Sequence, residues 1–257
     1  MRLFTLLQAL LVVSVVANPL GPKDVQPIEK RENPRVIGTG FNSQQRLQIR
    51  DALSDILHMT HYVLSASDDV VNYILPKYFR ADDKTAVTDV FRKIAGSDYS
   101  GASVLRRLTI KADQNDPYVT DSDREEDDAL VINGEGATPR LVIFPEAFKK
   151  GGIDKPYSGV SAVTCNSIGA AVSENMETLA SVILHEYMHY KALVVPPLRS
   201  SPMDLENGYG PYNTRFVLPK NQAIHNADSF AWYALELYWT MKCGRYFQDP
   251  ENCLVYY

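Results

Sequence analysis

The chain has 257 residues, of which 45% are hydrophobic and 22% are charged, and its formal net charge at pH 7 is -5. This composition is that of a folded globular protein, and the length suits one large domain or two small ones. The excess of acidic residues argues against a nucleic-acid-binding protein, which needs a concentrated basic surface.

The first residues have the pattern of a secretory signal peptide. Arg2 supplies a positive charge, an apolar run extends from Leu3 to Val16, and Ala17 is the small residue at which cleavage is expected. The alternative is a membrane anchor, but the run is shorter than the ~20 residues that a spanning helix needs. We therefore expect a secreted, extracellular protein that has no membrane attachment once the signal is removed.

Three segments follow from this pattern. Residues 1–17 are the predicted signal peptide, and residues 18–31 end in a Lys-Arg pair. That pair indicates either a short propeptide removed by a dibasic-specific protease or a solvated tail. Residues 32–257 form the predicted single domain, because no linker divides them.

The first part of the domain has helical patterns. Apolar residues recur at helical spacing over residues 41–79, which predicts one or two helices beginning at Asn42 or Ser43. A further helix is expected to start after Asp82 or Asp83 and to end at Gly96. The acidic run that contains Asp121, Asp123 and Glu125 comes later, and two alternatives were considered for it. It lacks the glycine and closing glutamate of a calcium-binding EF-hand loop, so a solvated loop is the preferred interpretation.

The second part combines short strands with two long helices. Strands are predicted over residues 129–133 and 140–144, with a third over 161–165. Long helices are predicted over 174–195, with Ser173 as N-cap, and over 222–243. The fold class is therefore α+β, mostly helical with a small mixed sheet. Aromatic residues at helical spacing in the last helix are expected to pack in the core: Phe230, Trp232, Tyr233, Tyr238 and Trp239.

The chain has three cysteines, Cys165, Cys243 and Cys253. The last two flank a short loop, and in a secreted protein this arrangement predicts a disulfide between them. Cys165 would then be a buried free thiol or would pair with another chain.

The predicted helix over 174–195 contains His185, Glu186 and His189 in the order H-E-x-x-H. Residues four apart lie on the same face of a helix, so the two imidazoles can bind one metal ion. Zinc is favoured because it takes neutral nitrogen ligands in tetrahedral geometry. Glu186 would stand beside the ion as general base for a bound water. The alternative is a helix with two hydrogen-bonded core histidines, which leaves the buried acid without a reason.

A catalytic zinc site needs a third protein ligand. The loop after the helix contains Asp204 and Glu206, and the next helix region contains His225 and Asp228. The residue types alone do not choose among them.

The chain resembles the deuterolysin-type, or aspzincin, secreted zinc metalloendopeptidases, which include lysine-specific members. The motifs that carry the resemblance are H-E-x-x-H, the "NADSF" stretch of residues 226–230 and the "YG" pair Tyr209–Gly210. Residues 77–94 also resemble the helical region upstream in that family. The resemblance covers most of the expected mature chain and implies a zincin-like fold with an H-E-x-x-H active-site helix.

The resemblance also implies roles for further residues. Counting back from Tyr209, the position of the family's aspartate ligand is occupied by Glu206, which is therefore preferred over Asp204 and His225. Tyr209 is expected to stabilise the transition state. Asp228 would either line the substrate pocket or support the site through hydrogen bonds. Ala231 replaces the second acid of the lysine-specific members, so lysine specificity is not expected.

The sequence therefore predicts a secreted endopeptidase that uses one zinc ion and cleaves protein or peptide substrates, and that is monomeric. The site would consist of His185, His189 and Glu206 as ligands, Glu186 as general base and Tyr209 as transition-state donor. The alternative is a non-catalytic secreted protein that binds zinc or another protein on the same scaffold. It draws support from the third-ligand motif, because the family's Gly-Thr-x-Asp pattern lacks its leading Gly-Thr here and has Glu206 in place of the aspartate. Glu186 argues against it.

Overall fold

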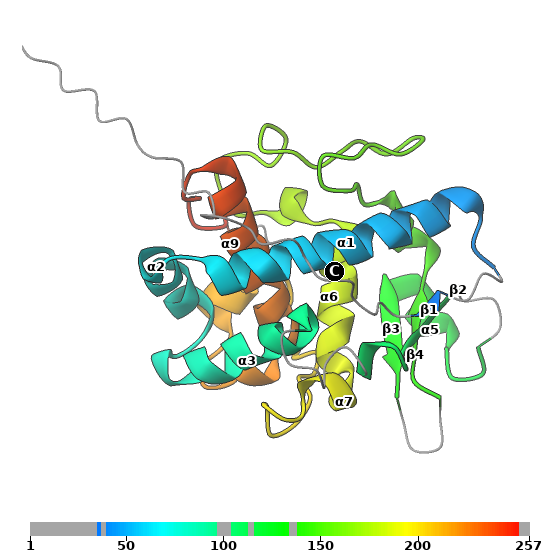
Figure 1. The fold of residues 1–257 in the computed structure, drawn as a ribbon, viewed down its shortest axis with the longest axis horizontal. Coiled ribbons are helices and arrows are strands. Elements are labelled where there is room, and N and C mark those ends of the chain that lie inside the picture. The colour runs from blue at the N-terminus through cyan, green and yellow to red at the C-terminus, as the bar shows by residue number, and fades with distance from the viewer. Residues whose placement is uncertain (1–34, 37–39, 97–103, 113–115, 134–137, 252–257) are drawn as a thin grey trace, which may run out of the picture.

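The computed structural model describes residues 35–36, 40–96, 104–112, 116–133 and 138–251. The predicted signal peptide, nearly all of the lead-in before the first helix and Cys253 lie outside the described residues. The fold is α+β, as predicted, with helices gathered on one side of the molecule and a small sheet on the other (Figure 1). Helix α6 (Leu179–His189), which carries the two histidines, lies between these two parts.

The first helical stretch forms two helices, α1 (Ser43–Ser65) and α2 (Asp68–Tyr78). Asn42 caps α1: its side chain accepts a hydrogen bond from the Gln45 backbone N–H, and the Gln45 side-chain oxygen accepts one from the Asn42 backbone N–H. Helix α3 (Lys84–Ala95) ends where predicted, because Gly96 takes the left-handed conformation, with φ of 68°, that closes many helices.

The sheet has four strands in the order β1-β2-β4-β3. Strands β1 (Arg35–Val36), β2 (Thr109–Ala112) and β4 (Arg140–Ile143) are parallel, and β3 (Ala129–Ile132) pairs antiparallel with β4. The sheet is therefore mixed, and β3 is one of its edges. The predicted strand over 161–165 is wrong. In that segment Val163 forms only an isolated bridge with Ile153.

The acidic run forms a helix rather than the predicted loop. Helix α5 (Asp121–Glu126) begins at Thr120, whose hydroxyl accepts from the Asp123 backbone while the Asp123 carboxylate accepts from the Thr120 backbone. Acidic residues in the first turn of a helix are stabilised by its dipole and free N–H groups, which is why this run can be helical. The preceding Val119 packs with Ile132 and its neighbours in a small separate hydrophobic cluster.

The two long C-terminal helices are shorter than predicted. Thr178, not Ser173, caps α6, and Ser173 precedes only a short 3-10 turn over Glu174–Met176. Tyr190 leaves the helical conformation, so α6 ends at His189 and a separate short helix follows, α7 (Lys191–Val194). The last helix, α9 (Ala227–Cys243), begins after a 3-10 turn, and the segment before that contains the short α8 (Gly210–Tyr212).

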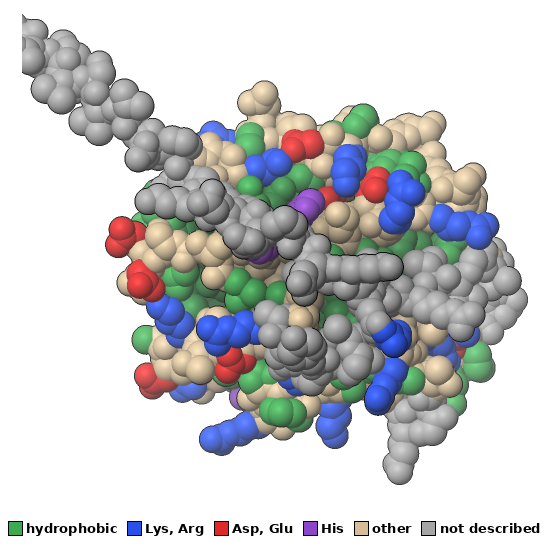
Figure 2. Space-filling view, viewed as in Figure 1, with side chains coloured by type: hydrophobic (Ala, Val, Ile, Leu, Met, Phe, Trp, Pro, Cys, Tyr) green, Lys and Arg blue, Asp and Glu red, His purple; other side chains and the backbone are tan. Residues whose placement is uncertain are grey.

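The main core surrounds α6, which packs against α1, α9 and the edge strand β3. The aromatic residues of α9 are buried in this core, as predicted: Phe230, Trp232, Tyr233, Tyr238 and Trp239. The rings of Phe230 and Tyr233 pack against Phe79 and Phe91, so α9, which also contacts α6, is fixed to the N-terminal helices. On the face drawn in Figure 2, the Lys and Arg side chains of the described residues are scattered rather than gathered in one patch.

The disulfide differs from the predicted one. Cys243, at the end of α9, is bonded to Cys165, with the two Cα atoms 5.5 Å apart, and not to Cys253. The two cysteines are 78 positions apart in sequence, so only the packing of the segment around Cys165 onto α9 brings them together. Within the described residues, no helix is long and apolar enough to cross a membrane.

Candidate metal centre

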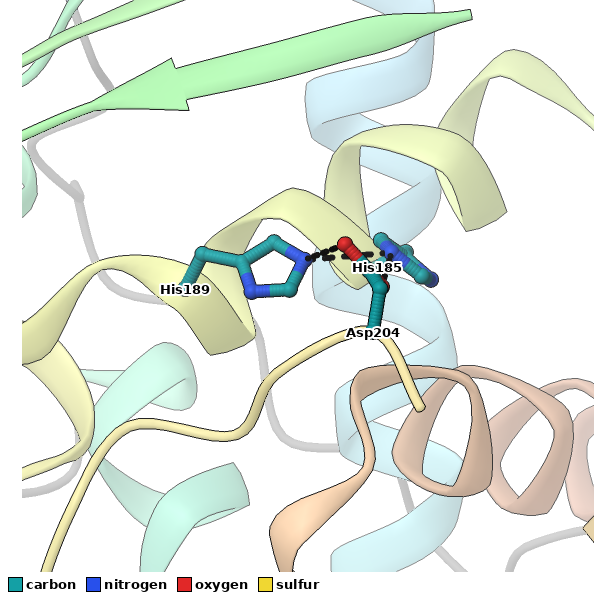
Figure 3. A group of neighbouring side chains, drawn as sticks. All are labelled: His185, His189 and Asp204. Atoms are coloured by element: carbon teal, nitrogen blue, oxygen red, sulfur yellow. Dashed lines mark hydrogen bonds and ion pairs between the residues drawn. The ribbon is translucent and has the colours of Figure 1, made fainter. Parts of the chain in front are cut away.

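His185 and His189 lie one turn apart on α6, and their rings approach one another beside the helix (Figure 3). Their Nε2 atoms are 3.2 Å apart. Neighbouring ligands of a tetrahedral zinc ion at 2.0–2.1 Å are separated by about 3.3 Å, so the two imidazoles are spaced as such ligands would be.

Asp204 completes the group from the loop that follows α7 (Figure 3). Its carboxylate oxygens lie 2.9 Å from Nε2 of His185 and 3.2 Å from Nε2 of His189. Among the described residues, these three side chains are the group whose donor atoms converge closely enough to hold one metal ion. The acidic run in α5 forms no such group among its described side chains.

The structure brings Asp204, rather than Glu206, to the histidines. Glu206 is exposed and lies outside the convergent group. His225, the other alternative, also has an exposed side chain. Its backbone carbonyl accepts a hydrogen bond from the Met203 N–H at 2.8 Å, and in this way it helps to hold the loop that carries Asp204.

Both histidines present Nε2 to the centre because Nδ1 is already bonded. Nδ1 of His185 lies 2.7 Å from Oδ1 of Asp228, and Nδ1 of His189 lies 3.0 Å from the carbonyl oxygen of Pro202. An acceptor at Nδ1 places the proton there and leaves the Nε2 lone pair free for a metal. Two lone pairs and a carboxylate then converge, and this arrangement needs a positive charge at its centre.

The pKa shifts of His185 and Asp204 reflect the same need. Burial opposes a charge on His185, but hydrogen bonds with Asp204 and Asp228 outweigh it and raise the pKa of the imidazole well above its usual value. Burial of Asp204 is likewise outweighed by its bonds to the two histidines, so the pKa of its carboxyl falls. The site thus favours a carboxylate facing positive charge, which a divalent cation supplies better than protons.

Asp228 supports the centre instead of being free to line a pocket. Its Oδ1 holds His185, and its Oδ2 accepts a hydrogen bond from the Gly210 N–H at 2.7 Å. One carboxylate therefore connects α9 to the histidine helix and to the end of the Asp204 loop. Of the two roles considered for Asp228, the geometry matches the supporting one.

Asn226 is a site residue that the sequence interpretation missed. Its side-chain oxygen accepts from the Leu205 N–H at 3.3 Å, and its amide nitrogen donates to the Gly208 carbonyl at 3.0 Å. The Ala227 backbone N–H also donates a hydrogen bond to the Met203 carbonyl, which joins the same two segments. The "NAD" stretch was the available signal: Asn226 holds the ligand loop and Asp228 holds a ligand histidine.

Glu186 faces the edge of the sheet. Only 6% of the residue is exposed, and its Oε2 accepts a hydrogen bond from the Val131 N–H of β3 at 2.9 Å. Burial raises the pKa of its carboxyl to about 7, against the opposing effect of the two histidines. A carboxyl with such a pKa can both take up and release a proton near neutral pH.

Tyr209 lies beside His185, at the end of the Asp204 loop. Its ring is stacked at 15° to that of His185, with the centroids 6.4 Å apart, and 47% of the residue is exposed. Burial of the hydroxyl, together with the negative charges of Asp204 and Asp228, raises the pKa of Tyr209. The phenol therefore stays protonated and can donate a hydrogen bond to a ligand.

The chain was compared with protein-family models and with curated proteins, and neither comparison found a match. The chemistry of the site is therefore inferred from its geometry. The structure contains an α+β domain in which two histidines and an aspartate could bind a metal ion, beside a buried glutamate on a sheet edge.

Proposed function

We propose that this protein is a secreted zinc endopeptidase that resembles the deuterolysin-type family. The observation that carries the proposal is the convergence of His185, His189 and Asp204 with the buried Glu186 one residue along the same helix. A protein that only stored metal would not need an acid in that position. The Cys165–Cys243 disulfide supports an oxidising, extracytosolic location.

The donor set matches zinc in type as well as in spacing. Two neutral imidazoles and one carboxylate are typical of catalytic zinc sites, which leave a fourth position open. A zinc ion held here would lower the pKa of a bound water toward about 7 and would polarise a substrate carbonyl. His185, His189 and Asp204 are its proposed ligands, and Asp228 orients His185.

The chain's own groups supply the proton transfers. Glu186, with its pKa near 7, accepts the proton of the attacking water and then passes it to the departing nitrogen of the cleaved bond. Tyr209 donates its hydroxyl proton in a hydrogen bond to the substrate oxygen as negative charge develops there. A donor of this kind is typically worth about 2.7–4 kcal/mol in the transition state.

The position of strand β3 supports the proposal that the substrate is a peptide. It is an edge strand, so one side of its backbone is not paired within the sheet, and Val131 on that side already contacts Glu186. An extended peptide can add to such an edge through main-chain hydrogen bonds. A substrate bound in this way would place its backbone beside the general base.

The test is digestion of an unfolded protein by the mature chain loaded with one equivalent of zinc, with fragments read by mass spectrometry. Glu186→Gln should abolish cleavage while zinc content, measured by elemental analysis, stays at one per chain. Glu206→Gln is the matched control, because it makes the same change at an exposed acid. It should leave both the cleavage activity and the zinc content unchanged.

The alternative function is zinc or protein binding without catalysis. It is favoured by the loop around Asp204, which departs from the family's Gly-Thr-x-Asp pattern. The same experiment separates the two functions. If the wild-type chain and the Glu186→Gln variant both hold zinc and neither produces fragments, the endopeptidase proposal is rejected and the binding function is retained.

A further inference from the structure

A surface pocket lies apart from the metal centre. It is formed by α2, the π-helical turn over Asn213–Val217 and the end of the described chain. Its volume is about 330 Å³. None of its lining residues belongs to the metal centre: Tyr73, Pro76, Lys77, Arg215, Phe216, Lys220 and Asp249. Three of these seven residues are basic, which is unusual in a chain with a net negative charge.

Two of the cations are held by a buried carboxylate. Glu236 of α9 is completely buried, accepts a hydrogen bond from Lys77 Nζ at 3.0 Å and is paired with the guanidinium of Arg215. Arg215 also donates to the Tyr78 hydroxyl at 3.1 Å and to Asp249 at 2.8 Å. Asp249 is the one acid among the lining residues, and its side chain is 65% exposed.

The third cation has no carboxylate partner. Lys220 donates to the backbone carbonyl of Lys77, but it forms no ion pair with any acid among the residues that the structure describes. Burial, reinforced by the positive charge of Arg215, lowers the pKa of its ammonium group to about 8. Three basic groups of the pocket therefore lie against two carboxylates, Asp249 in the lining and the buried Glu236 beneath it, and Lys220 pairs with neither.

The mouth of the pocket is aromatic. Tyr73 and Phe216 are 48% and 54% exposed, and the Lys77 ammonium lies 4.1 Å from the centre of the Tyr73 ring. Exposed aromatic side chains beside an uncompensated cation favour a ligand with an anionic head and an apolar body. A lysine ammonium group binds carboxylates well, since charge-assisted hydrogen bonds are the stronger ones.

We propose that this pocket binds a small carboxylate with an apolar body. The carboxylate would lie against Lys220, and the body would lie between Tyr73 and Phe216, while the buried Arg215 remains bonded to Glu236 and Asp249. Aromatic acids and the carboxyl terminus of a peptide share this chemistry. The proposal does not depend on the metal centre or on endopeptidase activity.

Binding is tested with benzoate by isothermal titration calorimetry at pH 7, with N-acetylphenylalanine as the peptide-terminus probe. Acetate, phosphate and chloride at equal ionic strength are the comparison anions. We expect benzoate or N-acetylphenylalanine to bind saturably and more tightly than the comparison anions. Lys220→Met should weaken this binding by about tenfold or more, as expected for a lost charge-assisted hydrogen bond. Lys149→Met, which removes an exposed lysine elsewhere, is the matched control and should bind as wild type does.

Two further measurements keep the result interpretable. Thermal unfolding of Lys220→Met checks that this variant folds. In the wild-type chain, the ¹³Cε resonance of Lys220 reports its titration directly, and a bound carboxylate should raise its pKa because an anion stabilises the charged form. The proposal is overturned if neither aromatic probe binds beyond the chloride response, if phosphate alone binds, or if Lys220→Met binds as wild type does.

Discussion

Oδ1 of Asp228 lies 2.7 Å from Nδ1 of His185, although the two residues belong to different helices. This bond connects the first turn of α9 to the metal-binding face of α6. The other oxygen of the same carboxylate holds Gly210, beyond the Asp204 loop. The position of His185 and of the end of the loop that carries Asp204 is therefore coupled to the start of one helix.

Asp228→Asn should weaken zinc binding roughly 10–100-fold, the usual effect of losing an outer-shell partner of a ligand histidine. The amide keeps the size of the side chain but loses the charge, and it can no longer accept at both positions with the same strength. Zinc affinity measured by competition with a chromogenic chelator gives the result. Unchanged affinity would show that Asp228 does not orient His185.

Asp204→Asn should weaken zinc binding more than Asp228→Asn does, because it alters a proposed direct ligand. Glu206→Gln should leave the affinity unchanged, because Glu206 lies outside the convergent group. The same chelator competition compares the two variants. The opposite ranking would return the third-ligand role to Glu206, the residue favoured by the sequence.

Gly208→Ala should displace the loop that carries Asp204. A Cβ atom at this position would lie 2.4 Å from Oδ1 of Asn226, closer than real Cβ contacts allow. We expect the free energy of unfolding to fall by about 1–3 kcal/mol and zinc affinity to fall with it. Asn207→Ala, at the exposed neighbouring position, is the control and should change neither quantity in urea unfolding and chelator competition.

Cys165→Ser should lower the free energy of unfolding by about 2–5 kcal/mol, the usual effect of removing a native disulfide. Cys253→Ser should leave the Cys165–Cys243 bond in place. Peptide mapping without reduction identifies the bonded pair, and denaturant unfolding measures the stability. A Cys243–Cys253 peptide in the wild-type map would contradict the described pairing.

Lys220 should make the free energy of unfolding vary with pH in the alkaline range. Its pKa in the folded chain is about 8, below its ordinary value of 10.5, so between these values the unfolded chain binds more protons than the folded chain. The free energy of unfolding contributed by this group should therefore rise as pH increases from about 8 to about 10. Urea unfolding of wild type and Lys220→Met across this range isolates the effect, since the difference between them should change with pH. Lys149→Met should run parallel to wild type.

The sequence by itself determined the local features of this protein. The α+β class, helices α1 to α3, strands β3 and β4 and the buried aromatic face of α9 follow from periodicity and capping residues, which act within a few positions of the chain. The placement of His185, Glu186 and His189 follows in the same way, because a helix puts residues four apart on one face. Local patterns also mislead: the acidity of α5 predicts a loop but stabilises a helix start, the predicted strand over 161–165 does not form, and Thr178 rather than Ser173 caps α6.

The tertiary structure decided everything that joins distant segments. Asp204 and Glu206 are two residues apart with the same chemistry, and only the bonds from Asn226 and the backbone of Met203 determine which one reaches the histidines. Cys243 has one candidate partner near in sequence, Cys253, and one far away, Cys165. The packing of the distant segment against α9 brings Cys165 to it. In each case a contact between segments outweighs proximity in sequence, and a contact of that kind exists only once the chain has folded.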